Sequence, residues 1–270
     1  MTPELDSVPD DGSDMTVHSF LGRPLTIVSV LPGLLNTNGD AANARVLAQR
    51  TRWAGHDARI IEVNTVADLP DVVDVVVIGS GSDSELAATR DVLRTLVTQL
   101  RTWVTHGVPI LAVGTGWELL SWGVQKADGT EVEGLGLIAG RAVARSVRVT
   151  DDLVVSSRFG RLVGFENHAR DYTGAEASPL GRVLVGSGNG NGAEGLMMGD
   201  LVGTHLHGPV LARNPRLADH LLSLAFARNH AAYVPGGPAT SVDVLAAAAR
   251  NQVAARLSLD SEDAVVSKDR

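Results

Sequence analysis

The feature that most constrains this chain is a unit of apolar strand, loop and helix that recurs along its N-terminal half. Runs of strand length, rich in β-branched apolar residues, occupy 25–31, 58–63, 72–78 and 109–113. The run at 72–78 is apolar apart from Asp74, which is typical of a strand buried on both faces of a parallel sheet. The recurrence predicts βαβ units, and therefore an α/β fold with a mostly parallel sheet and helices on both faces.

Helices are predicted behind most of these strands. Asp40 is a candidate N-cap for the first, in which apolar residues recur at near-helical spacing. Pro215 is placed to open another. The predicted helices cover 40–54, 84–105, a short stretch from Trp117, 215–229 and 242–257.

The second half of the chain has a different texture. From about Gly134, short apolar runs separated by turn residues lie at 153–157, 161–165 and 182–186. They predict an antiparallel extension of the sheet. The run 201–206 then predicts one last buried strand, which ends at a histidine.

Composition along the chain suggests three segments. Residues 1–22 are acidic and contain prolines, so we expect a disordered, solvated tail. Residues 23–232 are expected to form the single α/β domain, a normal size for one core. Residues 233–270 begin with a Pro-Gly hinge and continue as a C-terminal helix and a polar tail.

Charge and hydropathy exclude several classes of function. The chain has 23 Lys and Arg against 31 Asp and Glu, a net charge of −8, and so lacks the basic field that nucleic-acid binding needs. No apolar run has the length of a transmembrane helix, about 18 residues or more. The N-terminus has no signal-peptide pattern. We therefore expect a cytoplasmic protein.

The chain contains no cysteine. This excludes disulfides, thiolate zinc sites, iron–sulfur clusters and any mechanism that uses a cysteine nucleophile. The last exclusion has the largest consequence for function.

The first candidate site is the strand–turn–helix at 109–122. In a parallel sheet, ligands bind beyond the carboxyl ends of the strands, so this turn and the loops 33–39 and 79–83 are expected on one rim. Val113 to Trp117 has the form of a nucleophile elbow, a sharp turn that raises its apex residue above the sheet. The apex is Gly114, which has no side chain, and Thr115 is the only hydroxyl nearby. A plain glycine turn explains the same residues.

Histidines supply further candidates. His207 follows the last buried strand and is expected on the rim, and His205 points the same way if the strand continues. The pair suits a metal site poorly, because no Asp, Glu or third His lies close in sequence. Glu166 is placed to orient a histidine such as His168, although an ordinary salt bridge explains it equally well.

Two polar loops complete the candidates. The amides of Gly79 to Asp83 are able to form an anion nest or an oxyanion hole, but the loop lacks the ending of a phosphate-binding P-loop. Asp40 and Asn43 are explained most simply as helix caps.

Taken together, these segments resemble one family. The resemblance runs in order along residues 25–230 and is carried by 38–43, 78–85, 109–120, 134–137, 162–168, 179–185 and 203–209. The chain is similar to the class I glutamine amidotransferases of the CobB/CobQ-like branch, whose fold is flavodoxin-like. Within that branch it looks most like the GatD-type glutaminase subunits of lipid II isoglutaminyl synthases.

The resemblance implies a chemistry. In such enzymes a cysteine at the elbow apex attacks the side-chain amide of glutamine, a histidine acts as base, and backbone amides hold the oxyanion. Carried over, the base is His207, the oxyanion amides lie near Gly81 and Thr115, and Arg148 binds the α-carboxylate of glutamine. The resemblance also implies a heterodimer with a MurT-like Mur ligase subunit, which uses the ammonia to amidate the D-glutamate of lipid II. It implies no cofactor and no metal.

The chain departs from the family pattern where the chemistry occurs. The family elbow reads Cys-Gly-Gly-Tyr-Gln or similar, but residues 114–118 read Gly-Thr-Gly-Trp-Glu. The family oxyanion loop reads Gly-Gly-Gly-Gln-Asp, but residues 79–83 read Gly-Ser-Gly-Ser-Asp. Glycine has no atom that forms a thioester, and loss of such a nucleophile removes on the order of 10⁴-fold of the rate or more.

Three interpretations remain open. The chain has lost glutaminase activity but still docks on a Mur-ligase-like partner; or it is active through another nucleophile such as Thr115, or is an engineered Cys-to-Gly form of an active parent at Gly114; or it is a non-catalytic binder or scaffold that reuses the rim pocket.

Overall fold

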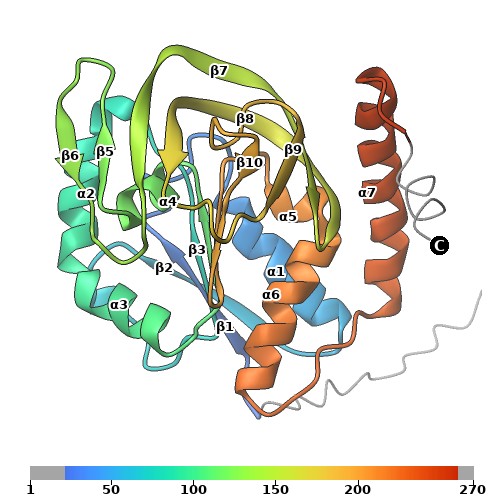
Figure 1. Ribbon diagram of the computed structural model, residues 1–270. Helices are drawn as coiled ribbons and strands as arrows, with labels where there is room; N and C mark the ends of the chain where they lie inside the picture. The colour runs from blue at the N-terminus through green and yellow to red at the C-terminus, as the bar shows by residue number, and fades with distance from the viewer. Residues whose placement is uncertain (1–21, 261–270) are drawn as a thin grey trace, which may run out of the picture.

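The computed structural model describes residues 22–260, and its centre is a six-stranded sheet (Figure 1). The strand order is β11-β12-β4-β3-β1-β2, and every pair is parallel except β11 with β12. This is the flavodoxin-like order with one antiparallel edge strand added. The strands are β1 (Leu25–Val30), β2 (Ala58–Val63), β3 (Val75–Ile78), β4 (Ile110–Val113), β11 (Leu196–Met198) and β12 (Leu201–Thr204).

Both faces of the sheet are covered by helices. Alternate side chains of each buried strand point to opposite faces, so apolar side chains on both faces need a helical layer to cover them. Val76 and Ile78 join the core under one helical layer, and Val75 and Val77 join the core under the other. The first layer is α2 (Leu86–Thr95) and α3 (Val97–Thr105); the second is α1 (Ala42–Trp53), α5 (Val210–Arg213) and α6 (Pro215–Arg228).

A second sheet provides the antiparallel extension. Its order is β10-β9-β7-β5-β6, with β8 paired to β7. In Figure 1 the long strands β7 and β8 arch across the molecule. The strands are β5 (Gly123–Gln125), β6 (Glu131–Glu133), β7 (Arg141–Ser157), β8 (Gly160–Thr173), β9 (Gly181–Val185) and β10 (Ala193–Glu194).

The remaining elements connect or flank the sheets. Two single-turn 3₁₀ helices, η1 (Val66–Asp68) and η2 (Asp83–Glu85), lie in connections, and α4 (Thr115–Leu120) follows β4 directly. The last helix, α7 (Gly237–Arg256), stands at the edge of the molecule (Figure 1). Helix α7 is joined to the rest of the fold by the buried Arg50 of α1. The Arg50 guanidinium forms ion pairs with Asp219 of α6 at 2.7 Å and with Asp243 of α7 at 2.6 Å.

The α/β fold, the mostly parallel sheet and the antiparallel extension are confirmed. The prediction of one helix over 84–105 was wrong, because the helix is broken at Leu96. Leu93, Leu96 and Leu100 are all buried, so the break keeps an apolar stripe against the sheet. The predicted strands 153–157 and 161–165 are the ends of much longer strands, β7 and β8.

Two expectations concern the ends of the chain. The predicted acidic tail lies outside the described residues except for its last residue, and so does most of the predicted C-terminal polar tail. Among residues 22–260, no helix has the length and apolar character needed to cross a membrane.

Candidate active site

Four loops meet beyond the carboxyl ends of the parallel strands. They follow β1, β3, β4 and β12, and β1 and β3 flank the point where the strand order reverses, which is where flavodoxin-like sheets bind ligands. The loops after β1, β3 and β4, together with strands β7 and β8, line a cavity of about 250 Å³. Its lining includes Asn38, Ser80, Asp83, Gly114, Thr115, Glu118, Arg148, Asn167, His168 and Arg170.

Gly114 occupies the sharp turn between β4 and α4. Its φ of 51° and ψ of −123° place it in a backbone conformation that L side chains adopt only under strain. Its N–H donates to the carbonyl oxygen of Thr204 at 2.8 Å, and its own carbonyl accepts from Glu118 N–H at 2.9 Å. The turn therefore has the strained backbone of a nucleophile elbow, with a glycine at its apex.

His207 faces this apex from the loop after β12. The ring is completely buried, and its backbone N–H donates to the carbonyl oxygen of Phe165 at 2.9 Å. Nδ1 lies 3.0 and 3.2 Å from the two carboxylate oxygens of Asp40, which is also completely buried. Asn38 Nδ2 lies 3.3 Å from the same Nδ1. A carboxylate on one ring nitrogen orients an imidazole for work as a base.

The apex and the histidine are in direct contact range. A Cβ built on Gly114 would lie 2.9 Å from Cε1 of His207 and 2.6 Å from Oγ of Ser80. Any side chain at the apex would therefore sit between the imidazole and the loop that follows β3. His207 and the apex are therefore close enough for an imidazole to meet an apex side chain directly, and residue 114 has none.

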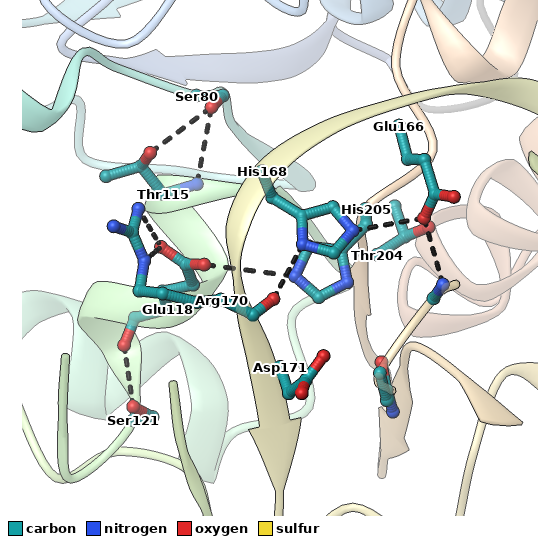
Figure 2. Close-up of polar contacts among 12 residues, drawn as sticks. Ser80, Thr115, Glu118, Ser121, Glu166, His168, Arg170, Asp171, Thr204 and His205 are labelled. Carbon is teal, nitrogen blue, oxygen red and sulfur yellow. Dashed lines mark hydrogen bonds and ion pairs between the residues drawn. The ribbon is translucent and has the colours of Figure 1, made fainter. Parts of the chain in front are cut away.

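Thr115 and Gly81 lie beside the apex, as expected for oxyanion donors. The Thr115 N–H donates to Ser80 Oγ at 3.3 Å, and its hydroxyl donates to the carbonyl oxygen of Gly81 at 3.0 Å. A Cβ at Gly81 would lie 2.8 Å from the carbonyl oxygen of Leu34, so the loop approaches closely there only because this residue is glycine. Figure 2 shows Ser80 facing Thr115.

Two arginines line the cavity on the side of β7 and β8. Arg148, which is half exposed, donates through Nε to Asn167 at 2.8 Å and through Nη1 to Asp83 at 3.1 Å. Arg170 is buried and donates through Nη2 to the other oxygen of Asp83 at 2.7 Å. Both guanidinium groups are therefore held in place by one carboxylate at the wall of the cavity.

Behind Arg170 a buried ion pair begins a longer polar network (Figure 2). Arg170 donates through Nε to Glu118 at 2.9 Å, and the Glu118 side chain is 1% exposed. Burial opposes both charged forms, but each partner outweighs it for the other. The pKa of Glu118 falls to about 2, and the pKa of Arg170 rises above its ordinary value because of Glu118 and Asp83.

The network continues through His205, which is completely buried. Its Nε2 lies 3.9 Å from Glu118 and its Nδ1 lies 3.4 Å from Glu194. Burial disfavours the imidazolium, but these two carboxylates outweigh burial and raise the pKa of His205 to about 9. The ring stacks on His168 at a centroid distance of 4.2 Å. Burial and then the charge of His205 lower the pKa of His168.

The structure thus separates the sequence candidates. It brings Gly114, Gly81, Thr115 and Arg148 to the lining of one cavity. His207 is not part of that lining, but its ring lies against the apex at Gly114. His205 is absent from the cavity lining, because β12 ends at Thr204 and the ring turns into the core.

Glu166 has a carboxylate oxygen 3.0 Å from Nε2 of His168 and accepts hydrogen bonds from the backbone N–H groups of Ser187 and Gly188. It therefore orients His168 and not His207. Within residues 22–260, no group of three or more His, Asp and Glu side chains is arranged to hold a metal ion.

Two functional contacts escape the sequence analysis. Asp40 does not cap α1, whose N-cap is Ala41 without a side-chain bond. Its carboxylate instead lies 3.0 Å from Nδ1 of His207. Ser80 is 4% exposed and fills the space beside the apex. The only sequence signal was that position 80 departs from the family's oxyanion loop.

Comparison with known proteins agrees with this site. Residues 27–215 match the family model of the CobB/CobQ-like glutamine amidotransferase domain. The chain belongs to the CobB/CobQ-like glutamine amidotransferases. The match spans the loops after β1, β3, β4 and β12, and so includes both Gly114 and His207.

Two curated relatives show which members of the family the chain is similar to. It is 35% identical over 216 residues to the Staphylococcus aureus (strain N315) protein called lipid II isoglutaminyl synthase (glutamine-hydrolyzing) subunit GatD, covering 78% of this chain and 88% of that one. The Streptococcus pneumoniae (strain ATCC BAA-255 / R6) protein of the same name is 27% identical, with coverage of 76% and 82%. These matches confirm the predicted resemblance to GatD-type subunits.

Solved structures agree on the fold alone. The amidotransferase aligns with a chain from the structure of PurLQS from Thermotoga maritima with a TM-score of 0.53 and 13% identity, over 74% of this chain and 98% of the other. A crystal structure described as a glutamine amidotransferase aligns with a TM-score of 0.51 and 20% identity, over 73% and 98%.

Proposed function

We propose that this chain is the GatD-like subunit of a two-subunit synthase that amidates the D-glutamate of lipid II, and that it does not hydrolyse glutamine. The observation that carries the proposal is the apex. The backbone of Gly114 keeps the strained elbow conformation beside a buried base, yet no side chain is there to attack an amide. The amidation step then needs ammonia from solution.

The proposal rests on chemistry that the remaining residues do not replace. Attack on an amide needs a nucleophile within hydrogen-bond reach of its base. The hydroxyl of Thr115 donates to Gly81, on the side of Ser80, so its proton is directed away from His207. This argues against Thr115 as a substitute nucleophile.

A single engineered exchange explains the sequence less well than natural divergence. An exchange at 114 alone leaves the departures at Ser80, Ser82, Thr115, Trp117 and Glu118 unexplained. Several of these side chains contact one another: Ser80 contacts Thr115, and Glu118 belongs to the buried ion-pair network. We therefore regard Gly114 as one of a set of changes that accompany a lost activity.

The proposed partner is a MurT-like Mur ligase subunit, which would activate the carboxyl of D-glutamate with ATP. The two curated relatives, both described as subunits of a synthase, support this pairing. Because the reaction consumes ATP, we place the heterodimer in the cytoplasm. We propose no cofactor for this chain, since the family chemistry uses side chains and backbone amides only.

The proposal is tested with the purified complex of this chain and its ligase partner. Lipid II, ATP and either glutamine or ammonium chloride are supplied, and amidated lipid II and released ammonia are measured. With ammonium chloride we expect lipid II to be amidated. With glutamine we expect no more amidation than the background measured for the same complex carrying His207→Ala. Glutamine-dependent ammonia release at the rate of an intact relative would overturn the proposal. If the chain fails to bind the ligase but is stabilised by glutamine, the non-catalytic binder interpretation replaces it.

A further inference from the structure

The space left by the missing apex side chain is not empty. Ser80 follows β3 on the neighbouring loop and is 4% exposed. Its Oγ lies 2.6 Å and its Cβ 3.0 Å from the position that a Cβ on Gly114 would take. The Oγ distance requires Ser80 to move, and the Cβ distance is tight enough to need a further small displacement. Cε1 of His207 lies 2.9 Å from the same position, so the apex is confined by both residues. The hydroxymethyl group of Ser80 therefore occupies the volume of an apex side chain.

Rotation of Ser80 does not remove this conflict. A change of χ1 moves Oγ, but Cβ stays where the backbone puts it, 3.0 Å from the apex carbon position. The backbone is held in turn, because the carbonyl oxygen of Ser80 accepts from Thr37 N–H at 2.8 Å and that of Gly79 accepts from Gly116 N–H at 3.1 Å. The loop has little freedom to withdraw from the elbow.

The Ser80 side chain also takes up the hydrogen bond of a backbone N–H group. Its Oγ accepts the backbone N–H of Thr115 at 3.3 Å and lies 3.3 Å from the Thr115 hydroxyl (Figure 2). An oxyanion at this elbow would need the N–H group that follows the apex. One side chain thus fills both the volume of the nucleophile and the position in front of an oxyanion donor.

We propose that Ser80 seals the elbow, so that Gly114 and Ser80 form a compensated pair in which side-chain volume lost at one position is replaced from the other. The packing argument itself does not depend on the proposed function. Only the conclusion that the pair accompanies a lost glutaminase activity rests on the proposed function. Its consequence is that a cysteine restored at 114 alone is a blocked thiol, and that the site reopens only when Ser80 is also cut back to glycine. Ser80 is a positioning residue that controls access to the apex.

The test is a double-mutant cycle in the full-length chain: Gly114→Cys, Ser80→Gly and both together. Because the native chain has no cysteine, iodoacetamide labels position 114 alone and mass spectrometry follows it without background. We expect the thiol of the double variant to react on the order of tenfold faster or more than that of Gly114→Cys, whose reaction needs a local opening.

Thermal unfolding gives a second, independent measure. Overpacking in Gly114→Cys should lower the Tm by roughly 5 °C, and Ser80→Gly should recover more than half of that loss. The matched control is Ser82→Gly with Gly114→Cys. Ser82 lies on the same loop but turns to Ser84 and Glu85 at 3.0 and 2.9 Å, so it should rescue neither the Tm nor the labelling. If Gly114→Cys fails to fold, Gly114→Ala replaces it in the thermal cycle.

Equal labelling rates and additive Tm changes in the single and double variants would overturn the inference. Neither measurement needs glutamine or a ligase partner. The inference therefore fails separately from the proposed function, which fails if the native Gly114 chain releases ammonia from glutamine.

Discussion

Nδ1 of His207 lies 3.0 Å from a carboxylate oxygen of Asp40, and both side chains are completely buried. The two residues are far apart in the chain and reach each other from the loops after β12 and β1. A buried carboxylate that accepts a hydrogen bond from an imidazole holds both groups in one orientation. The part of the site that holds the base is therefore intact although the apex has no side chain.

Replacing Asp40 should destabilise the protein. Asp40→Ala leaves Nδ1 of His207 buried without its acceptor, which costs about 1–3 kcal/mol. Asp40→Asn keeps an acceptor oxygen and should lose less. Urea unfolding at pH 7 measures both, with Asp71→Ala as the control because Asp71 is exposed. Equal midpoints for Asp40→Ala and the control would show that the contact contributes nothing.

Acid stability should depend on Glu118. Its pKa falls from an ordinary 4.5 to about 2 in the folded protein, so its contribution is complete above pH 4.5 and is lost as the pH falls toward 2. Glu118→Gln removes a contribution of about 3 kcal/mol at neutral pH.

The difference in free energy of unfolding between the native protein and Glu118→Gln should therefore become smaller as the pH falls from 4.5 toward 2. Urea midpoints at pH 7, 5, 4 and 3, as chosen steps across that range, measure it. Glu133→Gln is the control, since the Glu133 side chain is 76% exposed. A gap that is the same at every pH would contradict the prediction.

Alkaline stability should depend on His205. Its pKa rises from an ordinary 6.5 to about 9, so the stabilisation is complete below pH 6.5 and is lost as the pH rises toward 9. His205→Asn should therefore differ most from the native protein at pH 6 and least at pH 9, as followed by thermal unfolding. His106→Asn, at an exposed position, should show no such trend; the same trend in both variants would assign it to another group.

Gly203 should not tolerate a side chain. A Cβ there would lie 2.5 Å from the ring of Trp117, which is buried and stacked on Tyr172 at 4.2 Å. Gly203→Ala should destabilise by about 1–3 kcal/mol, because a packed ring has nowhere to move. Gly33→Ala is the control, since a Cβ at Gly33 meets nothing within 4 Å. Equal urea midpoints for the two variants would contradict the packing argument.

Much of the fold was predictable because its signals are local. The run 72–78 contains β3, and the four residues of β3 are buried because they face helices on both sides. The run 25–31 likewise contains β1. The break at Leu96 was not predictable, since no glycine or proline marks it and it depends on which leucines meet the sheet.

The site was only partly predictable for the same reason. His207 and Gly114 stand at strand ends, where a parallel sheet places its ligand loops, so their neighbourhood follows from the pattern. Asp40 has the sequence position of a helix cap, and nothing local distinguishes a cap from a partner of His207. Likewise, Ser80 is one hydroxyl in a polar loop until the loop after β3 is packed against the elbow.

The sequence by itself determined the strands of the N-terminal half, the parallel character of their sheet, the family motifs and the absence of sulfur at position 114, because these depend on residue type and spacing along one chain. Only the tertiary structure decided that His207 meets Asp40, that His205 turns inward between Glu118 and Glu194, and that Ser80 fills the apex. These are contacts between loops distant in sequence. Such contacts are set by how the layers pack, and the residue type at one position does not indicate which atom from a distant loop will contact it.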